Sequence, residues 1–276
     1  MFSISDIQKG VKRPPRKAII YGPPKLGKST LAGSAKNALL IPTEDRVAHI
    51  DCAKTPVVSQ YEELIEIFQF LTTKAGEQFQ TVIIDSLDWL EPIIHDYLCR
   101  KNGYKSIDDD KNKETAFQKG LKYVAVGGWK KLLYNLDYLR SEYGKSIILV
   151  SHSHTITINP PEADSYDKNV MKIDKNALSV VEEWADIIGF YTKEIFVKKE
   201  EKSLNAKGKA ISSNRRMLYM SGENPAMING NSFGLTDVEV TLEHCTDIIE
   251  WILGKNDSGK NDSEEKETKK TNKKGE

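Results

Sequence analysis

The sequence lacks net charge, paired cysteines and long apolar runs. Its 276 residues carry 40 lysines and arginines against 40 aspartates and glutamates, so no overall electrostatic field attracts nucleic acid or a membrane surface. The three cysteines are widely spaced without a C-x-x-C pair, which argues against a disulfide framework and a zinc site and indicates a reducing compartment. No apolar run could cross a bilayer, and no secretory signal is evident. We therefore expect a cytoplasmic protein without membrane contact, in which any nucleic-acid surface is local.

One stretch carries a recognisable chemical motif. Residues 22–29, with the sequence GPPKLGKS, fit the phosphate-binding pattern G-x-x-x-x-G-K-[ST]. Residues 18–21 precede it as a short apolar strand and residues 30–36 begin a helix, so the strand–loop–helix context of the motif is present. A chance Gly- and Pro-rich turn is disfavoured by the apolar strand before it and by an acidic strand end downstream. The residues expected to contact a nucleotide are Gly22, Pro23, Pro24, Lys25, Leu26, Gly27, Lys28, Ser29 and Thr30.

The residue types in this loop fit the chemistry of phosphate binding. Gly22 and Gly27 let the backbone N–H groups turn inward into an anion nest. Lys28 is expected to reach the β- and γ-phosphates, and the Ser29 hydroxyl is expected to hold Mg²⁺. The sequence lacks an N-K-x-D guanine signature and a clear arginine-rich lid, which favours ATP as the nucleotide and argues against a small-molecule kinase.

Polar residues follow three further apolar strands. Glu44 follows the strand at 38–41, and it is either a general base at the ligand edge of the sheet or a carboxylate in a surface loop. Asp85 ends the β-branched strand at 81–86, where it could bind Mg²⁺ opposite Ser29. His152 follows the strand at 146–151, and it either senses the γ-phosphate or merely caps the strand end.

The hydrophobic pattern predicts one α/β domain over residues 17–254, after a solvated polar arm over 1–16 and before a disordered charged tail over 255–276. The tail either solubilises the protein or docks a partner. Helices are expected at 59–75, 87–99, 117–143, 177–185 and 241–253, a strand at 186–191, mobile or polar loops at 100–115 and 153–176, and a hairpin of 195–197 with 217–220 across the turn at 205–208.

Taken together, the motifs resemble a RecA-type ATPase core, specifically the phage-type RecA-related proteins of single-strand annealing and recombination. The likeness spans roughly residues 17–191, and the segments that carry it are 22–29, 40–44, 82–86, 147–152 and 183–188. The resemblance implies an α/β fold of the RecA-like P-loop NTPase type. That fold has a mostly parallel central sheet with helices on both faces, here followed by a C-terminal β-hairpin and helix.

The resemblance also implies roles for individual residues. Glu44 would activate the attacking water, and His152 would couple the state of the γ-phosphate to a DNA-binding loop. The segments 100–119 and 153–175 would bind single-stranded DNA, with Tyr104 or Tyr166 stacking on bases. Two features depart from the family pattern: a histidine replaces the usual glutamine at 152, and the first loop carries three consecutive aspartates at 108–110.

Such sites are usually completed by a basic residue from a neighbouring subunit. Arg215 and Arg216, just before a predicted strand, are the candidates, which implies a homo-oligomer in the form of a ring or filament. An exposed basic turn is the simpler interpretation. The main functional alternative is a nucleotide-dependent switch or loader that acts on a replication protein through the C-terminal tail.

Overall fold

The protein is described here from a computed structural model, which covers residues 3, 10, 14–162, 164–198 and 209–255. The N-terminal arm up to residue 13, except residues 3 and 10, the hairpin turn at 205–208 and the tail from 256 onwards lie outside the described residues. No helix in the described part is both long and apolar enough to cross a membrane.

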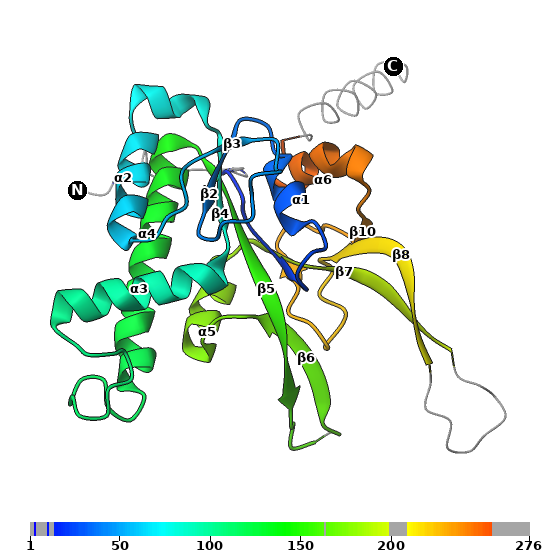
Figure 1. Cartoon of the computed structure of the whole chain (residues 1–276). Helices are drawn as coiled ribbons and strands as arrows, with labels where there is room; N and C mark the ends of the chain where they lie inside the picture. Colours follow the sequence, from blue (N-terminus) through cyan, green and yellow to red (C-terminus); the bar gives the residue numbers. More distant parts are fainter. Residues whose placement is uncertain (1–2, 4–9, 11–13, 163, 199–208, 256–276) are drawn as a thin grey trace.

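The centre of the fold is a mostly parallel β-sheet with the order β10-β8-β7-β1-β5-β4-β2-β3 (Figure 1). The neighbours from β7 to β3 are parallel, whereas β8 is antiparallel to β7, and β10 is antiparallel to β8. These strands are β1 (Lys17–Gly22), β2 (Ala38–Pro42), β3 (Ala53–Lys54), β4 (Thr81–Asp85), β5 (Ser146–Ile158), β7 (Ile187–Lys198), β8 (Lys209–Tyr219) and β10 (Val238–Glu239). The short β9 (Gly230–Asn231) pairs with β7.

Helices cover both faces of this sheet, and each face has its own apolar core. On one face, Ile19, Ile41 and Ile84 pack in one cluster with residues of four helices, α2 (Tyr61–Leu71), α3 (Leu87–Asn102), α4 (Val126–Tyr143) and α5 (Lys175–Trp184). On the other, Ile20, Leu40 and Ile83 pack with α1 (Lys28–Gly33) and α6 (Cys245–Ile252). Strands buried on both faces read as continuous apolar runs, which is why the sequence revealed them. The expected fold class is confirmed.

The register of the parallel strands brings their carboxyl ends to one edge. Gly22 of β1 lies opposite His152 of β5, and Asp85 of β4 lies opposite Pro42 of β2. The loop before α1 and the polar residues that follow these strands therefore meet at one place. The sheet order puts β5 between the strand of the phosphate loop and the strand of Asp85.

Two segments expected to be loops have structure of their own. Residues 153–176 form a hairpin, because β5 continues to Ile158 and pairs with antiparallel β6 (Tyr166–Met171), after which α5 begins at Lys175. Residues 100–115 were expected to form a mobile polar loop, but α3 extends to Asn102 and the segment buries Ile107 and Thr115. A π-helical turn, η3 (Gly120–Ala125), then leads into α4.

Other helices and strands differ from their expected boundaries by a few residues. The expected helix at 59–75 is α2 followed by the 3₁₀ helix η2 (Lys74–Gln78), and the last expected helix is the 3₁₀ helix η4 (Leu242–His244) followed by α6. The expected strand at 186–191 and the first arm of the hairpin are one strand, β7. Arg16 is not a solvated part of the arm, because its guanidinium donates to the carbonyls of Trp251 and Ile252 at the end of α6.

Candidate nucleotide-binding site

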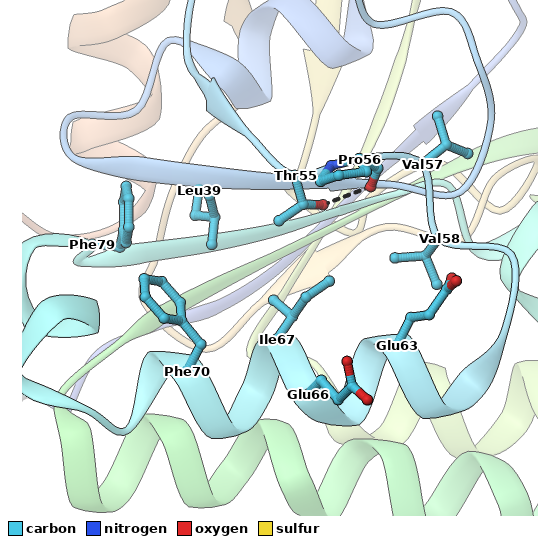
Figure 2. Close-up of a pocket in the computed structure, with 10 residues that line it drawn as sticks. All are labelled: Leu39, Thr55, Pro56, Val57, Val58, Glu63, Glu66, Ile67, Phe70 and Phe79. Atoms are coloured by element: carbon cyan, nitrogen blue, oxygen red, sulfur yellow. Dashed lines mark hydrogen bonds between the residues drawn. The ribbon is translucent and has the colours of Figure 1, made fainter.

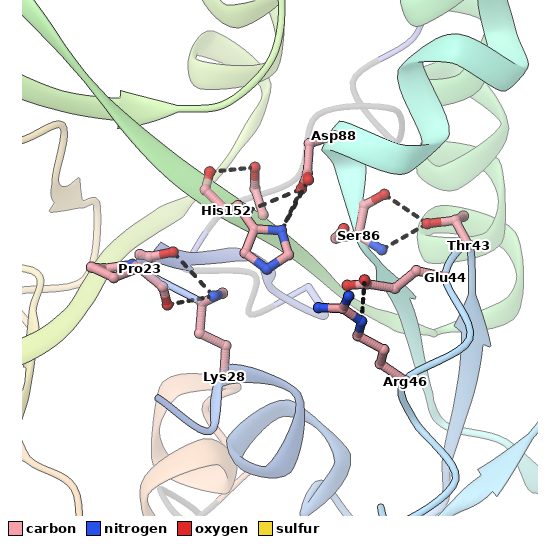
Figure 3. Close-up of polar contacts among 10 residues, drawn as sticks. Pro23, Lys28, Thr43, Glu44, Arg46, Ser86, Asp88 and His152 are labelled. Carbon is pink, nitrogen blue, oxygen red and sulfur yellow. Dashed lines mark hydrogen bonds and ion pairs between the residues drawn. The ribbon is translucent and has the colours of Figure 1, made fainter. Parts of the chain in front are cut away.

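The loop between β1 and α1 is shaped by close backbone contacts. A Cβ atom on Gly22 would lie 2.0 Å from the carbonyl oxygen of Tyr191, so only glycine fits there. Gly27 has a φ of 95°, a left-handed conformation that favours glycine. The Lys28 ammonium is buried and donates to the carbonyls of Gly22, at 3.0 Å, and Pro23, at 2.9 Å (Figure 3). Burial lowers the pKa of Lys28, and the carboxylates of the site oppose that shift.

Asp85 lies at the end of β4 with its carboxylate buried. It hydrogen-bonds to the Ser29 hydroxyl, and burial raises its pKa despite that bond and the charge of Lys28. Its Oδ2 atom is buried with no hydrogen-bond partner among the described residues. An unsatisfied carboxylate oxygen beside a hydroxyl is an oxygen ligand set of the kind that Mg²⁺ prefers. The residues present therefore fit a Mg²⁺ ion held by Ser29 and Asp85.

Glu44 faces the same space from the loop after β2. Its side chain is 11% exposed, and its carboxylate lies 3.9 Å from the exposed Arg46 guanidinium. Burial raises the pKa of Glu44, with Asp85 and Asp88 acting in the same direction and His152 against it. A carboxyl group whose pKa is shifted upward is better suited to accept a proton near neutral pH. Glu44 is thus not a loop carboxylate on the open surface.

His152 is held by Asp88 of α3, a residue that the sequence did not single out. The Asp88 carboxylate lies 2.9 Å from the His152 Nδ1 atom and also accepts the His152 backbone N–H at 3.0 Å (Figure 3). Burial acts to raise the pKa of Asp88, but the hydrogen bonds from His152 hold it below its usual value. Because a carboxylate only accepts, Nδ1 carries the proton and Nε2 is left available. Asp88 comes three residues after Asp85 in the first turn of α3, where acidic residues are favoured, and this position was the available signal.

Thr43 is a second residue that sequence reasoning missed. Its Oγ1 atom donates to the carbonyl of Ser86 at 2.8 Å and accepts the Ser86 backbone N–H at 2.8 Å, while its own N–H donates to the carbonyl of Asp85. These bonds tie the end of β2 to the end of β4. They fix Glu44 and Asp85 relative to each other.

A cavity of about 370 Å³ joins these groups. Its polar lining includes Arg46 and His49, two further residues that the sequence did not indicate. The lining residues are Pro24, Lys25, Gly27, Lys28, Ser29, Thr30, Glu44, Arg46, His49, Asp85 and His152. Of the expected nucleotide contacts, Gly22, Pro23 and Leu26 do not line it. The structure brings Glu44, Asp85 and His152 to the phosphate loop.

A larger pocket, of about 500 Å³, opens beside α2 (Figure 2). It is lined by apolar side chains such as Leu39 and Phe70, and its charged residues are Glu63 and Glu66. Two carboxylates repel a phosphate group, and no lysine or arginine lines this pocket to offset them. Its chemistry does not suit a nucleotide.

The two arginines expected before a strand lie inside β8 instead. Arg215 is exposed and pairs with Glu239, at 2.7 Å, and with Glu194, at 3.4 Å. Arg216 lies beside the phosphate loop of its own chain, where its guanidinium is 3.3 Å from the position that a Cβ atom on Gly27 would take. Neither arginine lies in an exposed turn, and neither lines the cavity.

The sequence matches the model of the family described as AAA domain over residues 14–226, which is more than half of the chain. This chain belongs to the AAA domain family. As an AAA domain protein it carries a P-loop domain for nucleotide binding, in agreement with the loop and cavity described above. Among solved structures, the crystal structure of the RadB recombinase is similar at 12% sequence identity and a TM-score of 0.44, covering 83% of this chain and 89% of that chain. No curated protein matches the chain.

Proposed function

We propose that this AAA domain protein is a RecA-like ATPase that hydrolyses ATP to ADP and phosphate and binds single-stranded DNA, in phage-type recombination or strand annealing. The observation that carries the ATPase proposal is the position of Glu44. It is a largely buried carboxylate with a raised pKa, and it shares one cavity with Lys28, Ser29 and Asp85.

Each residue of the cavity has a distinct part in this chemistry. Lys28 leaves its carbonyl partners to bind the β- and γ-phosphates, and Glu44 accepts a proton from the attacking water. Ser29 and Asp85 hold Mg²⁺, which supplies charge stabilisation to the phosphate oxygens. The Nε2 atom of His152 would face the space of the terminal phosphate, while Asp88 holds the ring through its Nδ1 atom. The same cavity would therefore bind the nucleotide and act on it.

The support for DNA binding comes from the hairpin that continues directly from His152. The β5 strand passes from the buried sheet through His152 into the β5–β6 hairpin, and the carbonyl of His152 accepts the N–H of Lys172 at the hairpin's other end. Tyr166 is 37% exposed on this hairpin, so its ring is available to stack on a base. Tyr104 is less suited, since its hydroxyl donates to Glu114. A nucleotide that contacts His152 would therefore act directly on the base of the β5–β6 hairpin, the proposed DNA-binding element.

The test is ATP hydrolysis by the full chain with and without single-stranded DNA, at low salt because phosphate contacts weaken as salt rises. We expect stimulation by DNA, retention of ATP binding in Glu44→Gln, and a loss of hydrolysis of about 100-fold or more in that variant. Asp45→Asn changes the adjacent exposed carboxylate and should hydrolyse normally. Normal hydrolysis by Glu44→Gln would refute the assignment of the base. Hydrolysis that ignores DNA would favour the alternative of a switch that acts on a protein partner.

We further propose that a homo-oligomer, a ring or filament, completes the site with an arginine from β8. Arg215 is the better candidate for action on a neighbour, because Arg216 already lies beside the phosphate loop of its own chain. The specific ATPase rate should then rise with protein concentration. A flat dependence at full activity would rule out an arginine supplied by the neighbour.

A further inference from the structure

A groove of about 290 Å³ lies between α3 and the continuous helical segment formed by η3 and α4. It is separate from the nucleotide cavity, and none of its lining residues lines that cavity. Helix α3 supplies Tyr97 and Lys101 to it, one turn apart, and the facing segment supplies Tyr123, Gly127 and Lys131. The two helical segments are in direct contact at the floor, where Gly128 packs against Ile94 and Leu98.

Two positive charges converge on this groove without a carboxylate to balance them. The ammonium groups of Lys101 and Lys131 come from different helices and lie 5.9 Å and 5.8 Å from the centre of the Tyr97 ring. Neither forms an ion pair within the described part of the chain. The nearby carboxylates of Glu62 and Asp96 are bound instead by Arg100, at 3.0 Å and 2.6 Å. Both ammonium groups border the groove beside the same ring, where a bound anion would be attracted by either of them.

Asp108, the first residue of the acidic run at 108–110, acts on residues of a different side of α3. Burial lowers the pKa of His95 and raises that of Cys99, and Asp108 raises both by a smaller effect, which follows that of Asp174 at His95 and that of Asp96 at Cys99. At 100° per residue, these two positions are turned about half-way around the helix from Tyr97 and Lys101. The side of α3 on which Asp108 acts is therefore not the side that lines the groove.

The groove also offers an exposed ring and an open backbone. Tyr123 is 63% exposed, with the Lys122 ammonium 5.5 Å from its ring centre. Gly127 is the second residue of α4 and lies inside the continuous η3–α4 segment, where glycine disfavours the helix, yet a Cβ atom there would meet nothing within 4 Å. Packing does not explain this glycine. The bare backbone leaves room in the groove between Tyr123 and Lys131.

We propose that the groove between α3 and η3–α4 binds single-stranded DNA, with a backbone phosphate between Lys101 and Lys131 and a base against Tyr123. The proposal rests on the proposed function. It adds a second binding surface for the same DNA strand, formed by helices, to the surface formed by the β5–β6 hairpin. Lysines beside aromatic rings match the two features of single-stranded nucleic acid, a charged backbone and stacking bases. An acidic protein could pair with the two lysines, but it would not account for the open helix backbone at Gly127.

The test is the affinity of the full chain for a fluorescein-labelled oligothymidylate, measured by anisotropy over a range of salt. Exchange of both Lys101 and Lys131 for Gln should weaken binding about tenfold at low salt and reduce the salt slope by about 0.7, the value for the one phosphate contact that is lost. The double exchange of Lys74 and Lys130 for Gln removes two exposed lysines that do not line the groove and lie outside the other expected DNA-binding segments, and it should have a much smaller effect. Gly127→Leu keeps every charge and should also weaken binding about tenfold, with no loss of thermal stability.

The outcomes separate this proposal from the function on which it rests. If the wild-type chain binds the oligonucleotide and the two lysine pairs behave alike, the groove is refuted and DNA binding stands. If the groove lysines matter but Tyr123→Ala and Gly127→Leu do not, the face attracts polyanions without stacking, and the base-binding groove is refuted. If the wild-type chain binds no oligonucleotide, both proposals fall.

Discussion

At the scale of single residues, the first prediction concerns Asp88, because its carboxylate holds both the ring and the backbone N–H of His152. In Asp88→Asn, the amide can donate to Nδ1 and move the proton to Nε2, so the wrong tautomer faces the phosphate. We expect kcat for ATP hydrolysis to fall about 10- to 100-fold, with KM changed less than about threefold. The tautomer of His152, read from its ring ¹⁵N shifts, should change as well.

The matched control for this variant is Asp96→Asn. Asp96 lies on the same helix, is exposed, and pairs only with the exposed Arg100 in the described part of the chain. Its exchange should leave the kinetics and the His152 tautomer unchanged. If Asp88→Asn kept the wild-type tautomer of His152 and only lost stability, Asp88 would have a structural role alone.

Asp85 gives a prediction about stability and pH. Burial raises its pKa in the folded state, so the ionised group opposes folding at every pH above its ordinary value of 3.8 and does so fully above the raised value. Asp85→Asn should therefore raise the free energy of unfolding of the metal-free protein at neutral pH, and this gain should shrink as the pH falls toward 4. Urea unfolding in EDTA at several pH values checks this. A gain independent of pH would contradict it, and added Mg²⁺ should stabilise only the wild type.

The strongest site residues could be predicted from sequence because they follow buried parallel strands. Asp85, Glu44 and His152 each come within three residues of the end of an apolar run, and the carboxyl ends of such runs share one edge of a sheet. Asp88 and Arg216 could not be assigned in this way, since their neighbours lie more than 60 residues away in the chain and are known only from the fold.

At the scale of elements, the β5–β6 hairpin was the principal segment that sequence reasoning misread. Residues 155–158 alternate threonine and isoleucine, a period-two pattern that indicates a strand, but the polar residues around them favoured a loop. In the structure, Thr157 donates to Asp167 across the hairpin, and Ile156 packs against the core. Cross-strand pairs of this kind stabilise a strand outside the central sheet.

Arg16 connects the first strand to the last helix. Its guanidinium donates to two carbonyls at the C-terminus of α6 and lies 4.1 Å from the centre of the Phe233 ring. A positive charge at this end of a helix is favourable. A Cβ atom on Gly254 would lie 2.7 Å from the Arg16 Cζ atom and would displace the guanidinium.

Arg16→Ala should lower the free energy of unfolding by about 1–3 kcal/mol. Arg100→Ala removes an exposed arginine with two ion pairs and should cost no more than about 1 kcal/mol. Equal costs in urea unfolding would show that Arg16 is only a surface residue.

At the scale of the whole molecule, nucleotide binding should appear as stability, because the cavity is built from the ends of four segments that meet only in the folded chain. A ligand that binds the folded state alone at 100 times its Kd adds about 2.7 kcal/mol, which is roughly 5–10 °C in Tm for a domain of this size. A non-hydrolysable ATP analogue with Mg²⁺ should produce this shift in the wild type and in Glu44→Gln. Lys28→Ala should abolish it, whereas exchange of the exposed Lys74 for Ala should not. A shift that survives in Lys28→Ala would mean that the nucleotide binds outside the phosphate loop, and the assignment of every residue around that loop would fall with it.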